Sequence, residues 1–182
     1  PDGQEAMVRY GKARSVAVAL SDVALDAEIS DSPSRFEASR ASLRYPGGFE
    51  VDDVAARIGP TDNAVRLTSA RVEGELGEEI KGTFSQATAK LDAVPLDASD
   101  LEGKWSYADG VLRLEDARLS VSDRTDGIAR FEPLVSENAV LTFDGSDITA
   151  LASLQHPASG SKVLDTRVDH NLAGESGSAI LT

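Results

Sequence analysis

The sequence contains no cysteine among its 182 residues. This absence excludes disulfide bonds, thiolate catalysis and zinc sites built on sulfur ligands. Positive charge is also scarce, because 18 lysines and arginines stand against 31 aspartates and glutamates and leave a formal charge of −13 at pH 7. An acidic surface repels the phosphates of nucleic acid and lacks the clustered cations that anionic lipid headgroups attract. Nucleic acid is therefore not expected as a partner.

Long hydrophobic runs and aromatic residues are scarce as well. The longest apolar runs, such as residues 16–20, fall far below the roughly 20 residues of a membrane-spanning helix. Aromatic residues make up 5% of the chain, although each can bury about 150–250 Å². This predicts a thin core, or one that is lined rather than filled. Because the chain opens with Pro1, we expect an excised piece of a larger protein.

What the sequence does contain is an alternation of apolar and polar residues with a period of two. It runs through 16–20, 23–29 and 36–38, and it recurs along most of the chain. This period is typical of strands with one buried face, so the pattern predicts about a dozen strands and an all-β class. The exception is "DDVAARIG" (52–59), for which we predict one short helical turn.

The segment "KWSYADGVLRLEDARLSV" (104–121) predicts a hairpin in register. If Asp109 and Gly110 form a type I′ turn, Trp105 faces Leu114 across it, and the apolar pairs fall on one face. The alternation slips at residues 115–116, which predicts a bulge or a sharp bend.

A second Asp-Gly pair, Asp144-Gly145, predicts another hairpin, in which Leu141 faces Ile148. Such short turns leave no room for crossover helices, so neighbouring strands are expected to be antiparallel. No linker divides the chain, and similar strand pairs repeat along it. Residues 1–182 are therefore predicted to form a single β-sheet segment that grows by adding hairpins.

Residues capable of catalysis are few. The two histidines, His156 and His170, lie in a predicted turn and a predicted strand, without metal-ligand spacing. "SGSK" (159–162) matches S-x-x-K but lacks its partner motifs. Aspartate-rich segments such as "DGSD" (144–147) suit turns better than a calcium loop. We predict that the chain is not an enzyme, and that it has no catalytic residue, no metal site and no cofactor. A hydrolase with a carboxylate pair is the weakest alternative.

The apolar face of the predicted sheet allows two interpretations. It could be the core of a closed sandwich, or it could line an open trough that accepts acyl chains, and periodicity alone does not separate them. The candidate groove residues share the apolar phase of their strands. They are Trp105, Tyr107, Leu112, Leu114, Leu119, Val121, Leu141, Phe143, Ile148 and Leu154.

Three segments carry a resemblance to a known family. They are "LEGKWSYADGVLRLEDARLSVSD", "RFEPLVSENAVLTFDGSDITALASLQHPASG" and "VLDTRVDHNLAGESGSAIL". Together they combine a G-x-W-x-Y-x-D-G-x-L hairpin with an F-x-P-L loop and an H-P-x-S-G turn. From about Leu101 to Thr182 the chain resembles the C-terminal part of the YdbH-like proteins, members of the AsmA/TamB-related group. The first hundred residues fit only through their general strand pattern.

The resemblance implies a fold, a function and a location. It implies an antiparallel, strongly curved, taco-like elongated sheet with an apolar concave face. It also implies a periplasmic bridge-like lipid-transfer protein that conducts phospholipids between the inner and outer membranes, with an inner-membrane anchor outside this segment.

Phospholipid acyl chains are then the expected partners, together with inner- and outer-membrane proteins. Self-association through an exposed edge strand of the isolated segment is also expected. The main alternative is a structural or adhesive β-sandwich or solenoid module of a bacterial surface protein.

Overall fold

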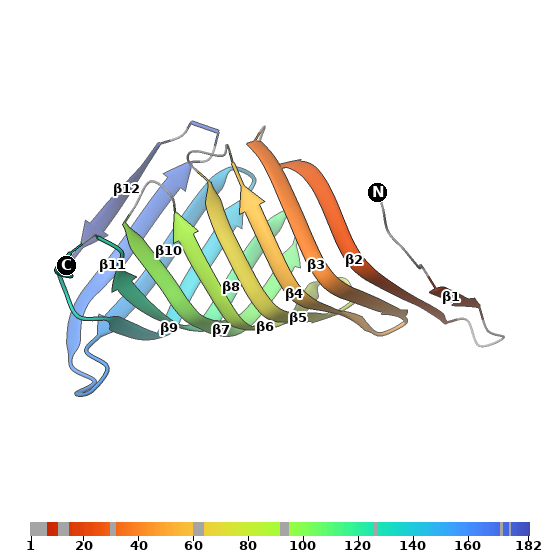
Figure 1. Ribbon diagram of the computed structural model, residues 1–182, viewed down its shortest axis with the longest axis horizontal. Coiled ribbons are helices and arrows are strands. Elements are labelled where there is room, and N and C mark those ends of the chain that lie inside the picture. The colour runs from red at the N-terminus through yellow and green to blue at the C-terminus, as the bar shows by residue number, and fades with distance from the viewer. Residues whose placement is uncertain are drawn as a thin grey trace.

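The computed structural model describes residues 7–10, 15–29, 32–59, 64–91, 95–125, 127–171, 173–174 and 176–182. They form one antiparallel sheet in which each strand pairs with its neighbours in sequence (Figure 1). The two outermost strands are not paired with each other in this sheet, so the sheet is open. The predicted all-β class and antiparallel pairing are confirmed. The described residues include no helix long and apolar enough to cross a bilayer.

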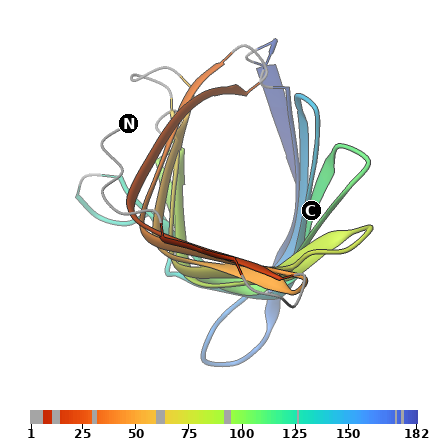
Figure 2. The same ribbon diagram turned by 90° about the vertical axis from the view of Figure 1, so that its right-hand side faces the viewer.

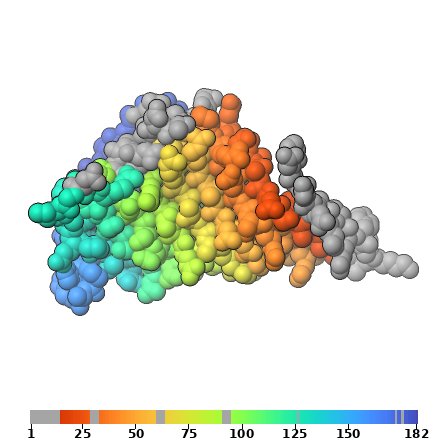
Figure 3. Space-filling model, viewed as in Figure 1, coloured from red at the N-terminus to blue at the C-terminus, as the bar shows by residue number. Residues whose placement is uncertain are grey.

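The strands are longer than the sequence pattern suggested, and most of them have nine to fourteen residues. They are β1 (Met7–Tyr10), β2 (Val16–Ile29), β3 (Ser32–Tyr45), β4 (Gly48–Ile58), β5 (Val65–Glu75), β6 (Ile80–Leu91), β7 (Leu96–Ala108), β8 (Val111–Asp123), β9 (Leu134–Asp144), β10 (Asp147–Gln155), β11 (Lys162–Asn171) and β12 (Ser176–Leu181). Their colours follow one another along the space-filling surface, as expected for a sheet built by successive hairpins (Figure 3).

The β7–β8 hairpin has the predicted register. Trp105 pairs with Leu114, and Tyr107 pairs with Leu112. Asp109 and Gly110 both have positive φ, at 52° and 83°, as a type I′ turn requires. A two-residue turn with a fixed twist leaves the flanking strands a single register, which explains why the sequence sufficed here.

The predicted turn of the β9–β10 hairpin is wrong by one residue, so the predicted partners are shifted by two residues. Asp144 pairs with Asp147, so the turn residues are Gly145 and Ser146. Gly145 has a φ of 63°, whereas Ser146 has no positive φ, as in a type II′ turn with glycine in the first central position. Phe143, rather than Leu141, therefore pairs with Ile148.

Five strands carry a residue of left-handed conformation near their middle. These residues have φ values of 49–53°, and we call them the bend line: Asp22, Asp53, Gln86, Asp100 and Asp116. Aspartate tolerates this conformation better than most side chains. Pairing is interrupted beside them, for example between Leu114 and Ala117 of β8. The irregularity predicted at residues 115–116, a bulge or a bend, is thereby confirmed.

The bend line keeps apolar residues on one side of the sheet. In β8, Glu115 and Asp116 are both exposed, whereas Leu114 is half-buried and Ala117 is buried. A single left-handed residue breaks the strict alternation, so the apolar spacing becomes three at that point. The same effect at Asp53 separates Val51 from Val54. This spacing resembles a helical period, which is why the predicted helical turn at 52–59 is wrong; that segment belongs to β4.

Side chains buried in the described sheet are small. The buried hydrophobic residues are Ala56, Ala64, Ala87, Ala117, Ala139 and Leu154. Large apolar side chains stay accessible, including Leu43, at 38% exposure, and Tyr107, at 46%. A sandwich whose two layers interdigitate would instead bury its largest side chains.

Viewed along its length, the ribbon runs down one side, across the bottom and up the other side (Figure 2). Strands β2–β4 form the first side and part of the bottom, and β10–β12 form the opposite side.

Candidate functional site

The registers align apolar residues in rows that cross the sheet from strand to strand, because directly paired residues point to the same side. One such row, here called the central row, runs close to the edge that carries the turns 46–47, 76–79, 109–110 and 145–146. Its members are Val18, Leu43, Phe49, Gly74, Gly82, Trp105, Leu114, Leu141, Ala150 and Val168.

A second row on the same side lies two residues nearer the turns. Its members are Ile80, Tyr107, Leu112, Phe143, Ile148 and His170. Tyr45 ends β3 two residues beyond Leu43, so it extends the same line at the other end of the sheet. We call these seven residues the rim row. It contains the polar-tipped residues Tyr45, Tyr107 and His170.

The ten predicted groove residues all fall on this side. Seven belong to the central and rim rows. Leu119 and Val121 lie beyond the bend line in β8, in phase with Ala117, and Leu154 lies in β10, in phase with Ile148. Leu154 is buried at 7% exposure, and Tyr107 is exposed. The structure therefore brings the ten onto one surface, while their role in lipid binding stays a prediction.

The aromatic rings of Phe49 and Trp105 contact each other over two glycines, Gly74 and Gly82. Their ring centroids are 5.8 Å apart, with a 41° angle between the planes. Gly74 and Gly82 separate the two residues in the central row, and a Cβ on Gly74 would lie 2.8 Å from atoms of both rings. The indole Nε1 donates a hydrogen bond to the backbone oxygen of Glu73 at 3.2 Å. The sequence did not reveal Phe49 or these glycines as part of the site, since the contact spans three strand pairs.

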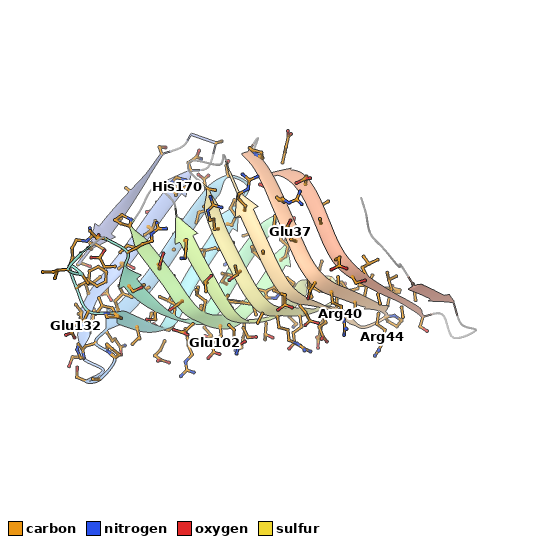
Figure 4. All side chains as sticks on the ribbon, in the orientation of Figure 1. Glu37, Arg40, Arg44, Glu102, Glu132 and His170 are labelled. Carbon is orange, nitrogen blue, oxygen red and sulfur yellow. The ribbon has the colours of Figure 1, made fainter. Side chains whose placement is uncertain are left out.

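The opposite side of the sheet is mostly polar, although Val140 and Leu151 are exposed on it, and it is cross-linked by ion pairs. Arg118 bridges Glu137 at 2.7 Å and Glu102 at 3.2 Å. The hydrogen bonds that Arg118 donates to Glu137 and to Glu102 raise the pKa of its side chain. The side chains of Arg40, Arg44 and Glu102 project below the bottom of the sheet, away from its interior (Figure 4). These pairs are exposed and screened by water, as expected for a hydrated surface.

Asp123 ends β8 and organises the loop that follows. Its carboxylate accepts hydrogen bonds from Arg130, at the backbone N and at the guanidinium Nε and Nη2, and from Thr125 N and Oγ1. The carboxylate is fully enclosed. The Arg130 side chain, followed by the other donors, holds the pKa of Asp123 far below its usual range. These hydrogen bonds hold the loop in place, and the donors from Arg130 and Thr125 occupy both oxygens of the Asp123 carboxylate.

Two clefts of the described surface include residues of the central row or of the bend line. One of about 1080 Å³ is lined by Phe49, Gly74 and Trp105 together with charged residues such as Glu73 and Lys104. Trp105 is the only predicted groove residue in it. The other, of about 630 Å³, lies at the bend line and includes Leu119. Neither is a continuous apolar channel. The described side chains also contain no cluster of three or more residues suited to holding a metal ion.

An open single sheet with an apolar side and a polar side offers an extended surface suited to binding an apolar ligand. The sequence profile of the YdbH-like family, described as intermembrane phospholipid transport proteins, matches residues 1–182. The chain belongs to this family, and the match extends over the first hundred residues, where the resemblance rested on general strand pattern. Searches of curated proteins and of solved structures gave no match. The family is one of transporters, which implies lipid binding and a periplasmic location.

Proposed function

We propose that this chain is a strongly curved, taco-like segment of a lipid-transfer bridge, whose apolar side is the concave wall of an open trough. Acyl chains of phospholipids lie against the central row while their headgroups stay in water. Each CH₂ group removed from water contributes about 0.8 kcal/mol, so the wall lowers the cost of moving a lipid through the periplasm.

The observation that carries this proposal is the apolar side that runs across the strand pairs without an interdigitated second layer. Large side chains on it, such as Leu25, at 57% exposure, and Leu43, remain accessible. The bend line supports the proposed curvature, because a left-handed residue interrupts each of five long strands near its middle. Small residues at the bend, such as Ala87 and Ala117, are buried there.

The rest of the bridge lies outside this segment in the proposal. It includes an inner-membrane anchor and proteins of the inner and outer membranes that load and accept the lipid. The alternative, a structural or adhesive β-module, has no need of an accessible apolar side, because exposed apolar surface promotes aggregation.

Trp105 provides the test, since it is the only tryptophan in the chain. The purified protein is mixed with phospholipids that carry bromine on their acyl chains, and quenching of tryptophan fluorescence is recorded. We expect quenching of Trp105. The matched control combines Trp105→Phe with Arg113→Trp, which moves the reporter to an exposed position on the polar side, where no quenching is expected. Equal quenching of both reporters, or of neither, would contradict the proposal, as would the absence of co-purifying phospholipid in native mass spectrometry.

A further inference from the structure

From the rim row we infer that bound phospholipids have one orientation, with their headgroups at the edge of the sheet that carries the turns 46–47, 76–79, 109–110 and 145–146, and their acyl chains toward the bend line. This inference rests on the proposed function and adds to it which edge of the trough the polar end of the lipid occupies.

The side chains of the rim row differ from those of the rows deeper in the sheet. Tyr45, at 59% exposure, and Tyr107, at 46%, are exposed, and His170 is half-buried. Each has an apolar ring that can contact the first carbons of an acyl chain and a polar tip that can hydrogen-bond to an ester or a phosphate. Such residues collect where a surface passes from apolar to wet. They also lie at one level across the sheet, from β3 through β7 to β11.

The row next to the bend line lacks such groups. Leu20, Ala41, Val51, Val72 and Phe84 are paired in sequence across β2–β6. They offer no hydrogen-bonding side chain, and the residues on the far side of the bend include Ala87 and Ala117. An acyl chain can enter this region without leaving a polar group unpaired, whereas a headgroup would lose its hydration there.

The hairpin turns add a preference in headgroup charge. They expose the carboxylates of Glu78, Glu79, Asp109, Asp144 and Asp147. The cations nearest these turns among the described residues are Arg44 and Lys81, both exposed, and the carboxylates outnumber them. With a rise of about 3.3 Å per residue, Asp109 lies within one Debye length of Tyr107, which is about 8 Å at physiological salt. A zwitterionic headgroup with an amine, such as phosphatidylethanolamine, therefore fits this edge better than anionic phosphatidylglycerol.

Two reporters and two brominated lipids test the orientation. The first reporter is native Trp105, one row from the rim row. The second combines Trp105→Phe with Phe84→Trp, an aromatic exchange beside the bend line. Phosphatidylethanolamine carries bromine either near the glycerol end or near the methyl end of its acyl chains. We expect glycerol-end bromine to quench Trp105 more than the Phe84→Trp reporter, and methyl-end bromine to do the reverse.

The polar tips are tested by Tyr107→Phe combined with His170→Phe, which keeps the rings. This variant should still show quenching but should lose the difference between the two lipids. A reversed order, or no difference in the unmodified protein, would overturn the inference while leaving lipid binding intact. If neither reporter is quenched, the result contradicts the proposed function itself. Equal or tighter binding of phosphatidylglycerol, in vesicles of matched bromination, would overturn the charge preference.

Discussion

The rings of Phe49 and Trp105 contact each other across two intervening strands because Gly74 and Gly82 leave the space beneath them free. The two aromatic residues are 56 positions apart in the chain, so this contact reports on the correct pairing of β4 through β7. It also fixes the indole through its hydrogen bond to Glu73.

Replacing Gly74 with alanine should displace this pair. The added Cβ would lie 2.8 Å from both rings, and overpacking of this kind costs about 1–3 kcal/mol. We expect a lower free energy of unfolding in urea and a red-shifted Trp105 emission. In a double-mutant cycle, the cost of Gly74→Ala should shrink when Phe49→Ala removes one of the obstructing rings. If Gly74→Ala lowers the free energy of unfolding equally with and without Phe49, the aromatic rings are not what disfavours a side chain at position 74.

Left-handed aspartates at the bend line should resist β-branched replacement. Asp22 has a φ of 50°, so Asp22→Val should destabilise the protein by about 1–2 kcal/mol. Asp22→Gly should be neutral or stabilising, because glycine reaches this φ without strain. Asp52→Val, at an extended position of β4, is the matched control and should cost little. Urea unfolding followed by circular dichroism measures all three, and equal losses for the two valine variants would contradict the strain argument.

The sequence pattern revealed the hairpins more fully than the bends. Asp109-Gly110 specifies its turn locally, and the phase slip at 115–116 located the bend at Asp116. At Asp53 the same slip imitated a helical period, because aspartate in a left-handed conformation leaves no distinct mark in the sequence. The central row was found only in part, since Phe49 and Gly74 join Trp105 through pairings between distant strands. For the β9–β10 hairpin, two positions of the turn were possible, Asp144-Gly145 as type I′ or Gly145-Ser146 as type II′. The residue types alone did not decide between them.

Charge introduced on the apolar side should abolish lipid binding without unfolding the sheet. Leu141→Asp places a carboxylate in the central row, where a bound acyl chain would have to desolvate it. Thr142→Asp, the adjacent residue on the polar side, is the matched control and should bind lipid normally. Native mass spectrometry measures bound phospholipid, and circular dichroism checks the fold. Unfolding of Leu141→Asp alone would indicate a sealed core.

Leu154 should be the most sensitive leucine of the described sheet. It is 7% exposed, and Leu→Ala at a buried site costs about 2–5 kcal/mol. Leu43→Ala should cost clearly less, because Leu43 is 38% exposed and leaves no closed cavity. Comparable losses at both positions, measured by urea unfolding, would be incompatible with an accessible apolar side.

The enclosed carboxylate of Asp123 should make the loop after β8 sensitive to acid. The hydrogen bonds from Arg130 lower the pKa of Asp123 from its ordinary 3.8, so the folded state binds the proton less tightly than the unfolded chain. The stability contributed by Asp123 is therefore present above about pH 4 and is lost as the pH falls toward the lowered pKa. Asp123→Asn should reduce this acid dependence in unfolding experiments between pH 2 and 6. At neutral pH it should also speed tryptic cleavage after Arg124 or Arg130, while an unchanged cleavage rate would show that the carboxylate does not hold the loop.

The outer edge of β12 should determine self-association of the isolated chain. Thr182 and Asp165 exchange both backbone hydrogen bonds, so in the antiparallel ladder the N–H of Ile180 also points to β11 and that of Ala179 points outward. Ala179→Pro therefore removes an outward donor and should lower the apparent mass at high concentration in analytical ultracentrifugation, with the fold retained. Ile180→Pro removes an inward bond instead and should detach β12, exposing the edge of β11. If Ala179→Pro associates as strongly as the unmodified chain, self-association uses another surface.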